Sequence, residues 1–265
     1  GWLFTEPNRN HLLRKMFKLL KKNGIICVSF TDRYGSFFEF IKKMAIYKYL
    51  QLTKVNSIGS KKSLAVSKKL MAGAFKKLPN QRKIEAWLQD AIFSPFLSWE
   101  YLWSSKEIVQ LASKHRVNYY SSAPRIYEFP RLSWYKKIQN TKHILNKIKL
   151  NYNNRKFDFL FGKEINLVNN KKKISKLTHQ INFIIKKISK YLKGPINNSP
   201  KINFSRVRKK LKNLGYSEKT VMEMEKFFKL IKNEKNPNLF VKKYKKLKNL
   251  YNGWGKNTHY ICLKK

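Results

Sequence analysis

Residues 19–32 have the sequence LLKKNGIICVSFTD, and this stretch decides the fold. Around its start, apolar residues recur at the spacing of a helix that packs one face on a core: Leu12, Leu13, Met16, Leu19 and Leu20. Lys21 and Lys22 suit the negative end of a helix dipole, and Asn23-Gly24 suits a left-handed cap. Residues 25–30 are mostly apolar and rich in β-branched side chains. They predict a strand buried on both faces, as in a parallel sheet beneath helices.

Polar residues appear where this strand ends. Ser29, Thr31, Asp32 and Arg33 lie at or just beyond its last positions. In open α/β sheets the ligand crevice lies outside the carboxyl ends of the strands. The helix–strand–turn unit therefore predicts an α/β fold and also the sheet edge that carries a site.

Length and composition predict a folded cytoplasmic protein. The chain has 265 residues, of which 42% are hydrophobic and 14% aromatic, and this argues against a disordered chain. Apolar runs stay well below the roughly 20 residues that span a bilayer, so we expect no stable membrane insertion. Cys27 and Cys262 both lie in strand-like segments. We expect reduced core cysteines rather than a disulfide, because a chain of this length needs no covalent staple.

The net charge of +45 allows two interpretations. It is spread evenly, with +21 in residues 1–150 and +24 in residues 151–265, and most of it is Lys accompanied by abundant Asn and Ile. The codons of these three residues are A/T-rich, so compositional drift explains the charge as well as selection for nucleic acid does. In either case we expect weak, salt-sensitive binding of nucleic acid or an anionic membrane surface through the Lys-rich helices.

The order of elements along the chain is mostly helical. A short strand is expected at 117–121 and another at 258–264, and the second lies so far from its partners that it must insert into an existing sheet. Helix 172–193 has an apolar face that predicts packing on the body rather than on a membrane. The predicted helices after the first are 36–52, 61–77, 81–93, 106–114 (capped by Ser104 or Ser105), 134–150, 172–193, 203–213, 217–233 and 237–250.

Two short motifs resemble a known family. LLKKNG at 19–24 is similar to the Leu-Leu-Lys-x-Gly-Gly turn before the fifth strand of class I S-adenosylmethionine-dependent methyltransferases, with Asn23 replacing the first Gly. WSSKEI at 103–108 is similar to that family's Phe-Ser-x-Glu-Glu-Leu entry to the helix before the sixth strand, with Lys106 replacing the first Glu. The resemblance covers residues 1–40, 95–130 and 252–265.

The resemblance implies a partial Rossmann-like α/β sheet with a large helical insertion before the last, antiparallel strand. Residues 1–131 would be the C-terminal part of the methyltransferase-like domain, 132–251 a basic helical insertion or cap, and 252–265 the strand that returns to the sheet. It also implies that Cys27 and Cys262 lie on adjacent antiparallel strands. The family's Gly-rich cofactor loop and the acidic end of its second strand have no counterpart here. Since the chain also does not begin with Met, we expect a fragment.

Candidate site residues follow from the strand ends and from the resemblance. Asp32 and Tyr34 are the candidate catalytic residues, because methyl transfer needs at most one general base beyond good positioning; their structural alternatives are capping a turn and plain packing. The resemblance places Gly1, Trp2 and Leu3 in the cofactor site. Candidates for binding substrate, as opposed to helix packing, are Glu6, Arg33, Trp99, Trp103 and Tyr120. The five histidines and two cysteines show no metal-ligand spacing, so no metal is expected.

The sequence therefore predicts S-adenosylmethionine-dependent methyl transfer to a small molecule or glycan precursor, by a chain that lacks most of the cofactor site. The alternative is a basic RNA-binding module without catalysis, and a third interpretation is a decayed enzyme kept as a partner protein. The enzyme hypothesis predicts that residues 1–4, 31–34 and 121–124 converge on one sheet edge. The RNA hypothesis predicts one concave face lined by lysines of several helices, with exposed aromatic side chains between them.

Overall fold

The structure is a computed structural model, and it describes residues 9–78, 82–127, 141–161, 171–193, 208 and 218–265. Over these residues it is a mixed α/β protein, mostly helical, with one three-stranded sheet. The chain separates into two compact units. The sheet unit comprises Gly1–Ser36, Glu100–Glu164 and Gly255–Lys265, and the helical unit comprises Phe37–Trp99 and Ile165–Trp254. The three-part division expected from the sequence stays a prediction.

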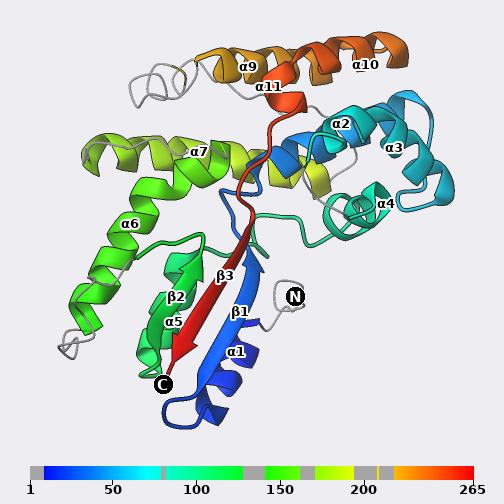
Figure 1. The fold of residues 1–265 in the computed structure, drawn as a ribbon. Coiled ribbons are helices and arrows are strands. Elements are labelled where there is room, and N and C mark those ends of the chain that lie inside the picture. The colour runs from blue at the N-terminus through cyan, green and yellow to red at the C-terminus, as the bar shows by residue number, and fades with distance from the viewer. Residues whose placement is uncertain (1–8, 79–81, 128–140, 162–170, 194–207, 209–217) are drawn as a thin grey trace. The chain divides into compact units, whose positions relative to one another are not determined.

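The sheet has the strand order β1-β3-β2, with β3 antiparallel to both neighbours (Figure 1). β1 is Ile25–Thr31, β2 is Asn118–Ala123 and β3 is Thr258–Lys264. The last strand of the chain thus lies between two strands that precede it by more than a hundred residues. Cys27 pairs directly with Cys262, so the predicted adjacency of the two cysteines is confirmed.

Both outer strands end at the same edge of the sheet. Thr31 pairs with Thr258, and Ala123 pairs with Tyr260, so the carboxyl ends of β1 and β2 lie beside the start of β3. This confirms the predicted convergence of 31–34 and 121–124, whereas residues 1–4 lie outside the described residues. A bulge between Tyr119 and Ser121 shifts the register of β2.

One face of the sheet is packed and the other is open. Val28 and Phe30 of β1 and alternate residues of β3 are buried, whereas Ile25 and Cys27 are exposed. The expectation that β1 is buried on both faces in a parallel sheet is therefore wrong, as is a core position for Cys27. The reason is that apolar, β-branched side chains favour a strand on either face, whereas burial depends on which face other elements cover.

In the part of the sheet unit that the structure describes, the helices are α1 (Arg9–Leu19), α5 (Ser105–Lys114) and α6 (Thr141–Phe161). α1 buries Leu13 and Phe17, and the Phe17 ring lies 6.0 Å from that of His115 at the end of α5. The predicted packed face of this helix is confirmed only in part, because Leu12 and Leu19 are exposed. The predicted cap of α5 is confirmed: Ser104 accepts from the Glu107 amide while the Glu107 carboxylate accepts from the Ser104 amide. α6 extends to Phe161, well beyond the predicted end at 150.

The helical unit consists of α2, α3, α4, η2, α7, α9, α10 and α11 in the described residues. Their bounds are α2 Phe37–Leu52, α3 Lys61–Phe75, α4 Ile84–Trp87, the π-helical turn η2 Leu88–Ile92, α7 Lys171–Lys193, α9 Glu218–Asn233, α10 Pro237–Lys246 and α11 Lys248–Tyr251. α2 is its core helix, with thirteen buried residues. α7 buries Leu177, Ile181, Ile184 and Ile188, which confirms packing of its apolar face.

The helix predicted over 237–250 is divided in two. Leu247 leaves the helical conformation, and the carboxylate of Glu223 on α9 accepts hydrogen bonds from the backbone amides of Asn249 and Leu250 at 2.7 and 3.1 Å. This carboxylate satisfies amides at the start of α11 that a continuous helix would have bonded internally. The helix predicted at 203–213 falls, apart from residue 208, outside the described residues.

Candidate functional site

The end of β1 carries a buried cluster centred on Asp32. This carboxylate has no exposed surface. Its Oδ1 accepts hydrogen bonds from the amides of Tyr34 and Gly35 at 3.0 and 2.9 Å, and its Oδ2 accepts one from the Tyr152 hydroxyl at 2.7 Å. Asp32 therefore fixes the turn that leaves β1, which is the capping role that the sequence offered as the alternative to catalysis.

Tyr152 comes from α6 and supplies the partner for the second carboxylate oxygen. Its ring lies 6.4 Å from that of Tyr34 and 6.0 Å from that of Phe159. Burial, reinforced by the negative charge of Asp32, raises the pKa of Tyr152 well above its ordinary value. Tyr152 consequently stays a hydrogen-bond donor across the physiological pH range.

His259 of β3 lies beside the same carboxylate. Its Nδ1 is 3.9 Å from Asp32 Oδ2 and 3.2 Å from the Ser105 hydroxyl, and its Nε2 is 3.0 Å from the carbonyl of Lys256. Since a carbonyl only accepts, Nε2 carries the hydrogen, and in the neutral ring Nδ1 accepts from Ser105. Burial lowers the pKa of His259, and the Asp32 charge opposes that effect.

This group is not arranged as a nucleophile triad. In a hydrolytic triad the carboxylate and the serine bond opposite nitrogens of the imidazole. Here Asp32 and Ser105 both face Nδ1, while Nε2 of His259 bonds to the backbone. All three side chains are at most 1% exposed. The cluster therefore sets the shape of the sheet edge and holds the start of β3 against the end of β1.

Two glycines let the chain pass close to this turn. A Cβ on Gly35 would overlap the backbone carbonyl of Lys256, and a Cβ on Gly255 would overlap the carbonyl of Gly35. Backbone and backbone therefore approach more closely here than any side chain permits. The segment that leads into β3 crosses directly over the Asp32 turn, which explains how the last strand is aimed into the sheet.

The other candidate residues near this edge have defined partners. Tyr34 is buried against Tyr152 and Phe157. A guanidinium nitrogen of Arg33 bonds to the carbonyl of Leu102 at 2.8 Å and to the carboxylate of Glu107 at 3.1 Å.

Trp103 is buried, and its backbone forms an isolated parallel β-bridge with that of Asp32. The Arg9 guanidinium lies 4.9 Å from the centre of the Trp103 ring. Arg33, Tyr34 and Trp103 are thus brought together with Asp32.

Not every candidate joins this group. Tyr120 is half exposed on β2, and Trp99 belongs to the helical unit, where its amide bonds to the Ser189 hydroxyl at 3.0 Å. The candidates that lie outside the described residues are Gly1, Trp2, Leu3 and Glu6. Sequence reasoning missed Tyr152, His259 and Ser105. The period-two pattern of residues 258–264 offered a signal for His259, since it shares a face with Ile261 and Leu263.

The helical unit contains a buried cation. The side chain of Lys42 has no exposed surface; its Nζ donates to the carbonyl of Gly253 and lies 4.1 Å from the centre of the Trp254 ring. Burial lowers the pKa of Lys42 to about 7, with Glu39 opposing the shift. The carbonyl and the aromatic face replace part of the hydration that the ammonium loses.

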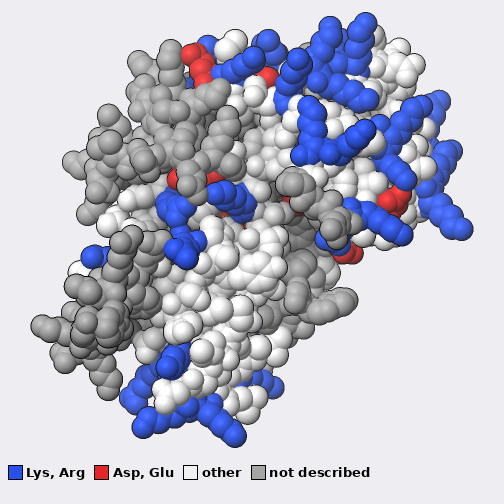
Figure 2. Space-filling model, in the orientation of Figure 1, with Lys and Arg blue, Asp and Glu red and all other residues white. Residues whose placement is uncertain are grey.

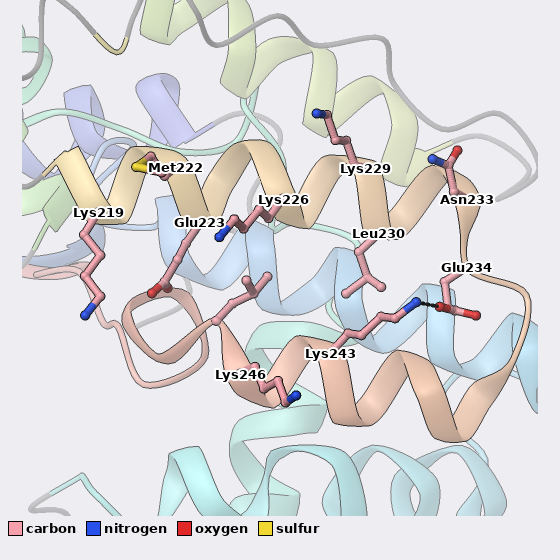
Figure 3. A pocket seen from close by; sticks show the side chains of 11 residues that line it. Lys219, Met222, Glu223, Lys226, Lys229, Leu230, Asn233, Glu234, Lys243 and Lys246 are labelled. Atoms are coloured by element: carbon pink, nitrogen blue, oxygen red, sulfur yellow. Dashed lines mark hydrogen bonds and ion pairs between the residues drawn. The ribbon is translucent and has the colours of Figure 1, made fainter.

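A basic groove of about 750 Å³ lies on the helical unit between α9 and α10. Figure 2 shows Lys and Arg side chains gathered where α3 and α10 lie. In Figure 3, Lys226 and Leu230 of α9 extend toward α10, and Lys243 of α10 extends to Glu234, with which it pairs at 2.6 Å. The lining residues are Lys219, Met222, Glu223, Lys226, Lys229, Leu230, Asn233, Glu234, Lys243, Lys246 and Leu247.

The charge of this groove is only partly balanced. Five lysines line it against two glutamates, one paired with Lys243 and the other engaged by the start of α11. Lys219 and Lys226 form no ion pair with any described acidic residue. No aromatic side chain is among the lining residues, although the RNA hypothesis predicted aromatics between the lysines. The groove can attract phosphates, but it offers no platform for stacked bases.

Within the described ranges, no group of three or more His, Cys, Asp or Glu residues is placed to hold a metal ion. None of the helices that the structure describes has both the length and the apolar character to cross a membrane. Comparison with protein-family models, curated proteins and solved structures finds no match to this chain.

Proposed function

We propose that this chain is the C-terminal part of a cytoplasmic S-adenosylmethionine-dependent methyltransferase that acts on a small molecule or glycan precursor. The observation that carries the proposal is the insertion of the last strand. The family resemblance predicted that residues 258–264 would enter the sheet antiparallel beside residues 24–30, and β3 pairs with β1 so that Cys27 lies opposite Cys262. Such a late strand, more than a hundred residues after β2, is an uncommon way to complete a sheet.

The position of the site edge gives further support. Asp32, Arg33, Tyr34 and the end of β2 gather where the two outer strands end. This is the edge at which open α/β sheets bind ligands. The buried bonds of Asp32 hold the turn rigidly, so its part in the proposed reaction is to position the neighbouring residues of the edge. Methyl transfer depends chiefly on such positioning, because the sulfonium carbon is already activated.

The cofactor itself requires more than these residues. S-adenosylmethionine supplies the methyl group when it is bound. The Gly-rich loop and the acidic strand end with which the family binds this cofactor have no counterpart in the sequence, and Gly1, Trp2 and Leu3 lie outside the described residues. Among the described strands, β1 is an edge strand; Trp103 bonds to its outer side at Thr31 and Arg33, so a further strand can pair along the residues before Thr31. The proposal therefore requires that another part of the protein complete the sheet there and hold the cofactor.

The test starts with the genomic reading frame that contains this chain. We expect it to encode, upstream of residue 1, a strand followed by a Gly-x-Gly loop and a second strand with an acidic end. Protein made from that whole frame should bind S-adenosylhomocysteine at one site per chain by calorimetry, and the 265-residue chain alone should bind it at least tenfold more weakly. A stop codon or an unrelated sequence directly upstream, or a whole-frame protein that binds no cofactor product, would refute the proposal.

A second function, binding of RNA through phosphate contacts, is favoured by one observation, the lysine lining of the α9–α10 groove. The test measures the affinity of the chain for a single-stranded RNA at increasing salt concentrations. Each counterion that binding releases makes the affinity fall more steeply as the salt concentration rises. Lys219→Glu with Lys226→Glu should weaken binding at least tenfold more than the matched pair Lys15→Glu with Lys18→Glu on α1, which changes the net charge equally. Equal losses would show binding by overall charge and would exclude the groove as the site.

A further inference from the structure

The two cysteines of the chain face each other on adjacent strands. Cys27 of β1 and Cys262 of β3 are direct partners in the register, and their Sγ atoms are 3.1 Å apart. Both are free thiols, Cys27 exposed and Cys262 partly so. Because the chain contains only two cysteines, any intramolecular disulfide has a single connectivity.

The hydrogen-bond pattern places this pair at a site where antiparallel strands come closest. Lys265 donates to the carbonyl of Gly24 at 3.1 Å, and Asp32 donates to the carbonyl of Asn257 at 2.6 Å. Hydrogen-bonded and non-hydrogen-bonded pairs alternate along the ladder, and Cys27 lies an odd number of residues from both positions. The pair with Cys262 is therefore non-hydrogen-bonded. Such pairs have a Cα separation of about 4.5 Å, within the range that a disulfide spans.

We propose that Cys27 and Cys262 form an oxidative modification site, at which a hydroperoxide joins them in an intramolecular disulfide between β1 and β3. This inference does not depend on the proposed methyl transfer. The sheet already holds the two sulfurs in contact, so the bond forms with little movement of the backbone.

The reaction has two steps. The Cys27 thiolate, the more exposed sulfur, attacks an oxygen of the hydroperoxide; the O–O bond breaks, an alcohol or water leaves, and a sulfenic acid forms on Cys27. The Cys262 sulfur then attacks Cys27 Sγ, the S–O bond breaks, and the hydroxyl leaves as water with the proton of the second thiol. Two thiols and one hydroperoxide thus yield one disulfide, one alcohol (or water) and one water.

The crosslink would hold the last strand of the chain in the sheet. It joins residues 27 and 262 and so closes almost the entire chain into one loop. Closing a long loop restricts the unfolded state and stabilises the folded one. We expect the midpoint of thermal unfolding of the oxidised chain to rise on the order of 5–15 °C.

The experiment treats the reduced, purified 265-residue chain with a twofold excess of hydrogen peroxide at pH 8. We expect a mass loss of about 2 Da, for two hydrogens, and loss of both thiols to maleimide. Trypsin should release peptide 23–33 joined to peptide 257–264, and dithiothreitol should reverse the change. In Cys262→Ser, peroxide should leave a sulfenic acid on Cys27 that dimedone traps.

The same treatment in 8 M urea tests whether the register of β1 and β3 is what promotes the disulfide between Cys27 and Cys262. Unfolding separates the cysteines along 235 residues of chain, so we expect the intramolecular disulfide to form at least tenfold more slowly. An equal rate in urea would overturn the proposal. So would oxygen addition to the separate cysteines without a crosslink, disulfides only between chains, or two thiols that peroxide leaves unchanged.

Discussion

The bond between Tyr152 and Asp32 gives the sharpest test of the strand-end cluster. Among the described residues, Tyr152→Phe removes the only hydroxyl within hydrogen-bond distance of Asp32 Oδ2, at 2.7 Å, while the ring that packs beside Tyr34 and Phe159 remains. Asp32 has no exposed surface, so water cannot replace the lost donor without opening the cluster. The variant therefore isolates one hydrogen bond to a buried carboxylate.

The expected loss of stability is about 2–3 kcal/mol. A hydrogen bond to a charged group contributes roughly 1.5–3 kcal/mol, and a buried acceptor that loses its partner costs the upper part of that range. The other polar side-chain atom described near this oxygen is His259 Nδ1, which carries no hydrogen in the neutral ring and, at 3.9 Å, is too far for a hydrogen bond. Tyr260→Phe is the matched control on β3, because its side chain is 49% exposed; we expect a change below about 0.5 kcal/mol.

The assay is urea unfolding, with hydrogen exchange of peptides from β1 and β3 as the local measurement. Tyr152→Phe should speed exchange in both strands, and Tyr260→Phe should not. A double-mutant cycle with Asp32→Asn should give a coupling energy of at least 1 kcal/mol. If Tyr152→Phe unfolds at the same urea concentration as Tyr260→Phe, or if the coupling is absent, the cluster does not hold the sheet edge as described.

Three further outcomes follow from the same structure. Lys42 is fully buried, and burial lowers its pKa from 10.5 to about 7, so the unfolded chain binds more protons between these values and stability rises with pH across them. The free energy of unfolding of Lys42→Met, relative to that of the wild type, should therefore be up to about 4 kcal/mol higher at pH 6.5 than at pH 10.5. Urea unfolding of both proteins at both pH values measures this, and a difference between them that does not change with pH would contradict the prediction. Burial also lowers the pKa of His259, so the stability that its neutral ring contributes is present above pH 6.5 and is lost as the pH falls below that value. His259→Gln should therefore flatten the fall in melting temperature between pH 6.5 and 5. Gly35→Ala should cost 3 kcal/mol or more in calorimetry, because a Cβ would overlap the Lys256 carbonyl, whereas Gly59→Ala, at φ 84° with nothing within 4 Å, should cost only about 1 kcal/mol.

The sequence by itself determined most of the elements and indicated that the last strand joins an existing sheet, whereas the place of that strand beside β1 was implied by the family resemblance. Periodicity predicted α5, α7 and α9 nearly to the residue, because helix propensity, capping residues and a one-sided apolar stripe are local properties. The sequence offered Ser104 or Ser105 as the cap of α5, and the structure shows that it is Ser104. The strand at 258–264 was predicted from its short apolar pattern. Its distance along the chain from the other strands then implied that it joins an existing sheet.

The tertiary structure alone decided burial and partnership. Ile25 and Cys27 are as apolar as Val28 and Phe30, yet they are exposed, because a strand's own sequence does not specify which of its faces is covered. Tyr152 and His259 reach Asp32 across 120 and 227 positions of sequence, and no local pattern encodes that meeting. The requirement for glycine at positions 35 and 255 also depends on the tertiary structure, because a side chain at Gly35 or Gly255 is excluded only where two backbone segments distant in sequence cross.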